Sequence, residues 1–123
     1  MPLPRLLTVW LPPFALMALI FWLSAQPDLN SGLGIVDLIG RKVVHMTEYG
    51  LLTWLWWRAV QSLPAAFVIA VAYAITDEFH QTFTSGRHGA PTDVLIDAIG
   101  AGIVCLALRR ASGKQSKEAG AKA

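Results

Sequence analysis

The feature that most constrains this chain is an uncharged apolar stretch close to its N-terminus. Leu6–Leu23 contains no Asp, Glu, Lys or Arg, and about 18 apolar residues suffice for a helix to cross a bilayer. Pro12 and Pro13 interrupt the stretch and predict a kink, which membrane helices tolerate. A cleaved signal peptide would need a small residue at Leu23, so we expect this helix to be retained.

Three further apolar runs follow, and the composition favours a membrane protein. Only 15% of the residues are charged, against about 25% in soluble chains. The stretch 63–76 has no charged residue, whereas a surface helix of a soluble protein carries charge on one side. The further runs extend from about Lys42 to Arg58, from about Leu63 to Phe79 and from about Asp93 to Leu108. The sequence therefore predicts an all-α integral membrane bundle of four transmembrane helices, and disfavours a soluble helical bundle.

The basic residues predict how this bundle is oriented. We assign residues 1–110 to the four-helix transmembrane domain and residues 111–123, which are polar and small, to a disordered cytoplasmic tail. With the N-terminus inside, the cytoplasmic side holds Arg5, Arg58, Arg109, Arg110, Lys114, Lys117 and Lys122, and the outside holds Arg41, Lys42 and Arg87. Because basic residues concentrate on the cytoplasmic side, we expect an N-in/C-in orientation. Small residues at Ala98 and Gly102 favour close helix packing.

The ionisable residues of the predicted helices gather at their outward ends. They are Lys42, His45, Glu48, Asp77, Glu78, His80, Asp93 and Asp97. Ionisable side chains are costly at membrane depth and usually face a bundle interior or a wet cavity. Lys42, His45 and Tyr49 follow one helical face, and Asp93 lies four residues before Asp97, on the same side of its helix. We therefore expect a polar pocket that opens outward.

Four segments of the chain carry a resemblance to a known family. They are Phe21–Pro27, Lys42-x-x-His45-x-x-Glu48-Tyr49-x-Leu51-Leu52, Asp77-Glu78-x-x-Gln81-x-Phe83, and Arg87 followed by Asp93-x-x-x-Asp97-x-x-Gly100. In this order they resemble the VanZ-like family over residues 21–102, although Asn is frequent in that family where Asp97 stands. The resemblance implies a multi-pass protein of the bacterial plasma (inner) membrane, associated with resistance to the glycopeptide teicoplanin. It implies no particular reaction.

We interpret the polar residues as candidates for two roles. Carboxyl groups held close together can act as an acid/base pair, so the catalytic candidates are Asp77, Glu78, Asp93, His45 and Glu48. The candidates for substrate binding are Lys42, Tyr49, Gln81, Arg87, Asp97, Ser24 and Gln26. The cations among them suit a lipid phosphate, such as that of an undecaprenyl-linked precursor. The alternative is a structural network in which the acids pair with Arg41, Lys42 and Arg87.

His45 could serve as a metal ligand or as a hydrogen-bonding group, and the metal site is the weaker interpretation. His45 and Glu48, together with Glu78 and His80, offer nitrogen and oxygen ligands on two helices. We instead expect His45 to hydrogen-bond a carboxylate or to bind an anionic head group. No metal or cofactor is predicted. Nucleic acid is excluded as a partner because no basic face with interleaved aromatic residues is present.

Two hypotheses of function remain from different classes. In the first, the protein binds or modifies a membrane lipid or a lipid-linked cell-envelope precursor at its outward pocket. In the second, it is a non-enzymatic membrane scaffold whose polar cluster only holds the helices together. A proton-coupled transporter is disfavoured, because no relay residue lies between Ala98 and Leu108. The sequence leaves open whether the chain forms a homo-oligomer.

Overall fold

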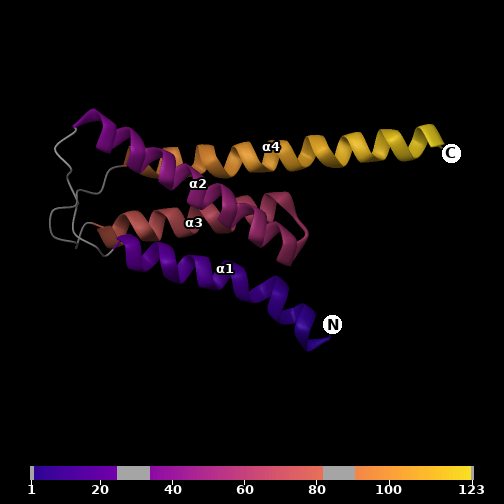
Figure 1. Ribbon diagram of the computed structural model, residues 1–123, viewed down its shortest axis with the longest axis horizontal. Coiled ribbons are helices and arrows are strands. Elements are labelled where there is room, and N and C mark those ends of the chain that lie inside the picture. Colours follow the sequence, from indigo (N-terminus) through magenta and orange to yellow (C-terminus); the bar gives the residue numbers. More distant parts are fainter. Residues whose placement is uncertain (1, 25–33, 82–90, 123) are drawn as a thin grey trace.

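The computed structural model describes residues 2–24, 34–81 and 91–122, and these residues form four helices (Figure 1). The helices are α1 (Leu3–Ser24), α2 (Ile35–Val60), α3 (Leu63–Gln81) and α4 (Pro91–Lys122). The all-α prediction is thereby confirmed. Two stretches, Leu3–Leu23 of α1 and Leu63–His80 of α3, are long and apolar enough to cross a membrane.

The four helices run back and forth along one bundle. α2 packs against each of the other three helices, and α3 packs against α1 and α4 as well. The N-terminal end of α1 and the C-terminal end of α4 lie on the same side of the molecule (Figure 1). Helix ends that are far apart in the sequence are thus brought together at each end of the bundle.

Local backbone geometry explains how α2 turns into α3. Gln61 has a positive φ of 56°, and its N–H donates to the carbonyl of Trp57 at 2.8 Å, which ends α2. The Ser62 hydroxyl then accepts from the Ala65 N–H at 3.3 Å, capping the start of α3. α3 begins at Leu63, as the sequence predicts.

α2 and α4 are both longer than the apolar runs predicted for them. α2 begins at Ile35, so Lys42 lies two turns inside the helix and not at its start. α4 continues to Lys122, through residues that we predicted to be a disordered tail. The tail residues 111–121 are exposed and rich in Ala, Lys, Gln and Glu, which are strong helix formers. This part of α4 extends beyond the bundle (Figure 1).

The core is built from small residues on α3 and aromatic residues on α2. Ala66, Ala70 and Ala74 form a fully buried stripe along α3, which lets the neighbouring helices come close. Trp56 of α2 is buried, and Trp10 of α1 meets its ring edge-on, with 6.1 Å between centroids. Bulky rings therefore fill the end of the bundle away from the polar side chains.

The closest contact between helices is the crossing of α2 and α4 at two glycines. A Cβ on Gly100 would lie 2.9 Å from the Cα of Met46, and one on Gly50 would lie 3.3 Å from the Gly100 carbonyl oxygen. The two backbones thus touch, and neither position has room for a side chain. The packing predicted at Ala98 and Gly102 is not where the close approach occurs, since a Cβ on Gly102 would meet only Phe67, at 3.9 Å.

Replacing Gly100 by Ala should separate α2 from α4. We expect Gly100→Ala to lower the free energy of unfolding by about 1–3 kcal/mol, the usual effect of overpacking, as measured by thermal unfolding in detergent. Gly113→Ala is the matched control, because a Cβ there meets nothing within 4 Å. Equal melting temperatures for the two variants would contradict the close crossing.

Candidate functional site: a polar cluster at one end of the bundle

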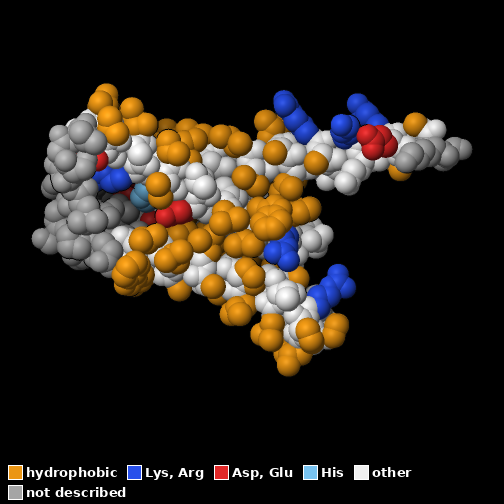
Figure 2. Space-filling model, viewed as in Figure 1, with side chains coloured by type: hydrophobic (Ala, Val, Ile, Leu, Met, Phe, Trp, Pro, Cys, Tyr) orange, Lys and Arg blue, Asp and Glu red, His pale blue; other side chains and the backbone are white. Residues whose placement is uncertain are grey.

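Eight polar residues of α2, α3 and α4 gather at the end of the bundle opposite to the chain termini. This polar cluster consists of Lys42, His45, Tyr49, Asp77, Glu78, His80, Asp93 and Asp97. Figure 2 shows acidic, histidine and basic side chains together at this end, while apolar side chains cover the middle of the bundle. Three contacts between helices hold the cluster together.

The first contact joins α2 to α4 about one helical turn from the glycine crossing. Nδ1 of His45 lies 3.1 Å from Oδ1 of Asp97, with the imidazole N–H donating to the carboxylate. Asp97 is only 2% exposed, and a carboxylate so deeply buried is costly without such a partner. Of the two roles expected for His45, the structure shows the hydrogen bond to a carboxylate.

The second contact joins α2 to α3 in the deepest part of the cluster. The hydroxyl of Tyr49, which is fully buried, donates to Oδ2 of Asp77 at 3.1 Å. Asp77 is 3% exposed. A carboxylate can accept several hydrogen bonds on its two oxygens, yet Oδ1 of Asp77 has no partner among the described residues. The Tyr49 hydroxyl therefore provides a hydrogen bond to only one of the two carboxylate oxygens of Asp77.

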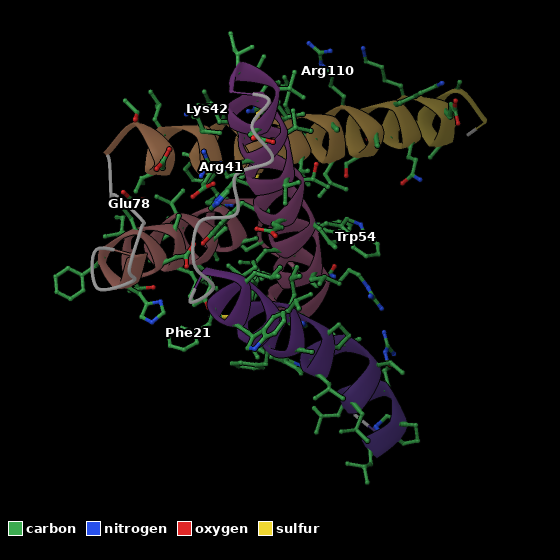
Figure 3. The ribbon with its side chains drawn as sticks, turned by 60° about the vertical axis from the view of Figure 1, so that its left-hand side comes forward. Phe21, Arg41, Lys42, Trp54, Glu78 and Arg110 are labelled. Carbon is green, nitrogen blue, oxygen red and sulfur yellow. The ribbon has the colours of Figure 1, made fainter. Side chains whose placement is uncertain are left out.

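The third contact lies at the rim of the cluster. Nζ of Lys42 is 3.6 Å from Oδ1 of Asp93, and the two side chains are 37% and 30% exposed. A partly exposed ion pair of this kind contributes little to stability. Lys42 thus lies at the rim of the cluster, next to Arg41 in the sequence, and Figure 3 shows both side chains at the same end of the bundle as Glu78.

The last turns of α3 carry three buried polar atoms that lack a partner among the described residues. These atoms are Oδ1 of Asp77, Oε1 of Glu78 and Nδ1 of His80. The imidazole of His80 stacks on Phe21 of α1, with ring centroids 4.1 Å apart. Nearly all buried polar atoms of native proteins are hydrogen-bonded, so the oxygens on Asp77 and Glu78 are able to accept hydrogen bonds from a water or a ligand.

The comparisons with known proteins agree with the family resemblance. The VanZ/LLP1 family model matches residues 9–111. The chain belongs to the VanZ/LLP1 family. Over 90 residues it is also 32% identical to a Bacillus subtilis (strain 168) protein called "Uncharacterized membrane protein YwnJ", and the match covers 68% of this chain and 64% of that protein. No solved structure gives a significant match. Together with its two apolar helices, this membership makes the chain a membrane protein.

The structure brings together most of the site residues predicted for this VanZ/LLP1 protein. The three helix-to-helix contacts involve Lys42, His45, Tyr49, Asp77, Asp93 and Asp97. Glu48 is half-buried on α2. Gln26, Arg87 and the side chains of Ser24 and Gln81 lie outside the described residues, so the roles assigned to them stay predictions. In the described part of the chain, no group of three or more His, Cys, Asp or Glu side chains is arranged to hold a metal ion.

The sequence pattern places His80 among the ionisable residues of the pocket but assigns it no catalytic or substrate-binding role, and it gives Phe21 no role in the site. The signal for His80 is its position three residues after Asp77, which places both on one side of α3. Phe21 could not be found in this way, because its contact with His80 depends on how α1 packs against α3.

Removing the Tyr49 hydroxyl should leave both oxygens of Asp77 unpartnered. We expect Tyr49→Phe to cost about 1–3 kcal/mol of unfolding free energy, the penalty for a buried polar group that loses its hydrogen bond. Thr47→Val is the control, since the exposed Thr47 hydroxyl bonds only to the Val43 carbonyl of its own helix. If both variants melt like the wild type in detergent, the buried bond between α2 and α3 is absent.

Proposed function

We propose that this protein crosses the plasma membrane four times, with both termini in the cytoplasm and the polar cluster facing outward. α2 and α4 contain 26 and 32 residues, and a helix of about 20 residues spans the bilayer core. Arg5 near the start of α1, Arg58 in the last turn of α2 and Arg109 in α4 all lie toward the end opposite to the polar cluster. Basic residues at that end support its cytoplasmic placement.

This topology predicts which positions a membrane-impermeant maleimide can reach. In a Cys105→Ser background, which removes the single cysteine, we expect Ser31→Cys to be labelled in intact cells. Ser112→Cys should react only after the membrane is disrupted, because it follows Arg109 and Arg110 in the part of α4 that extends beyond the bundle at the proposed cytoplasmic end. The opposite labelling pattern would invert the proposed orientation, and labelling of both positions in intact cells would contradict it.

We further propose that the polar cluster binds a lipid-linked component of the cell envelope. The observation that carries this proposal is the pair of carboxylate oxygens, Oδ1 of Asp77 and Oε1 of Glu78, that have no hydrogen-bond partner among the described residues. The carboxylate oxygens need hydrogen-bond donors, which the hydroxyl groups of a saccharide supply. Lys42 and Arg41, at the mouth of the cluster, are suited to a phosphate. A ligand with a lipid tail, a phosphate and hydroxyl groups meets all of these requirements.

The same acids are the candidates for chemistry on the bound ligand. Asp77 and Glu78 adjoin on α3, and Asp93 lies across from them on α4, so a general acid and a general base are both available. We connect this site with glycopeptide (teicoplanin) resistance through the family resemblance, since glycopeptides act on the cell envelope.

A scaffold function is the second candidate, and the contacts between helices favour it. The His45–Asp97 and Tyr49–Asp77 bonds join α2 to α4 and to α3, which is what a purely structural network would do. Glu78 separates the two candidates, because its Oε1 has no partner among the described residues. A structural network gains nothing from that atom, whereas a binding site uses it.

Glu78→Gln should therefore weaken ligand binding while leaving the fold intact. Using native mass spectrometry with an undecaprenyl-diphosphate-linked saccharide as the probe, we expect a roughly 10- to 100-fold loss of affinity, the effect of losing a charge-assisted hydrogen bond. The melting temperature should not change.

The matched control is Glu118→Gln, the same chemical change on the exposed end of α4. It should bind as the wild type does. Binding that survives Glu78→Gln would remove the basis for the ligand site. A lower melting temperature with unchanged binding would favour the scaffold. In that case, a strain that relies on this protein would grow in teicoplanin equally well with Glu78→Gln and with the wild type.

A further inference from the structure

A hollow lies between α3 and α4, at the opposite end of the bundle from the polar cluster. This apolar groove has a volume of about 520 Å³. Its lining includes Leu63, Pro64 and Phe67 from the start of α3, and Gly102, Leu106 and Arg109 from α4. The groove thus shares no residue with the polar cluster.

The groove exists because α4 presents a glycine to a ring of α3. A Cβ on Gly102 would stand 3.9 Å from the Phe67 ring, so a larger side chain at this position would enter the hollow. Arg109 is the one charged residue of the lining, and it is exposed. No ion pair joins Arg109 to any described acidic residue. The groove therefore combines an apolar wall with a single cation.

We propose that this groove holds an acyl chain of an anionic phospholipid from the surrounding bilayer, with Arg109 binding the phosphate of its head group. A guanidinium binds phosphate through two parallel hydrogen bonds, and basic pockets between transmembrane helices are recognised sites for anionic lipid head groups. The apolar lining contacts the acyl chain, and Arg109 favours a head group that carries a negative charge.

The charge of the groove favours an anionic lipid over a second copy of the protein. The volume of the groove lies within the roughly 300–1,000 Å³ that is common for small-ligand sites. The lone arginine is also complementary to an anion, and a second copy would bring the same cation to the contact.

Arg109→Gln tests the head-group contact, with Arg110→Gln as the matched control. Arg110 is the adjacent arginine, equally exposed, but it does not line the groove. By native mass spectrometry of delipidated full-length protein, we expect the wild type to bind phosphatidylglycerol in preference to phosphatidylcholine. Arg109→Gln should weaken phosphatidylglycerol binding about tenfold or more and abolish the preference, while Arg110→Gln keeps it. An equal loss in both variants would show a diffuse surface charge effect and overturn the proposal.

Gly102→Leu tests the groove itself, with Gly113→Leu as its control. The leucine should fill the hollow and remove bound lipid of either head group, whereas position 113 has open space around it. Lipid retained by a Gly102→Leu protein that melts as the wild type does would contradict the groove as the site. Dimers that disappear with Gly102→Leu, without a change in bound lipid, would assign the groove to a second copy and also overturn the proposal.

Discussion

The contact on which the rest of the structure depends is the crossing of α2 and α4 at Gly50 and Gly100. Because neither residue has a side chain, the two backbones touch there. One turn away from this crossing, His45 reaches Asp97 at 3.1 Å, and at the rim Lys42 reaches Asp93. A wider separation of the helices would leave Asp97 buried without a partner, which is costly for a carboxylate. The polar cluster is therefore a consequence of a backbone contact.

The polar cluster divides into a part that is satisfied within the protein and a part that is not. His45, Tyr49 and one oxygen of Asp77 make hydrogen bonds that connect three helices. Oδ1 of Asp77, Oε1 of Glu78 and Nδ1 of His80 have no hydrogen-bond partner in the described part of the chain. The first part positions the second, so under the proposed function stability and ligand binding use neighbouring but different atoms. This division is why single substitutions can separate a scaffold from a binding site.

The sequence predicted the helical class, the family and the start of α3, because apolar runs and motif order are local properties. It also included a carboxylate partner as one of two roles expected for His45, since acidic residues lie at the outward ends of the other helices. It did not predict that α2 begins at Ile35 or that α4 continues to Lys122, since those segments are not apolar. The Tyr49–Asp77 bond and the His80–Phe21 stack depend on helix packing, which no local pattern encodes.

The most direct test of the central claim is ligand-dependent stability. The melting temperature of the purified protein would be measured against increasing concentrations of an undecaprenyl-diphosphate-linked saccharide, with undecaprenol, which lacks phosphate and sugar, as the control lipid. A ligand that binds only the folded state raises stability by about 2.7 kcal/mol at 100 times its Kd. We predict a concentration-dependent rise for the saccharide lipid and none for undecaprenol. Equal responses to both lipids would contradict a polar binding site and leave the cluster a structural one.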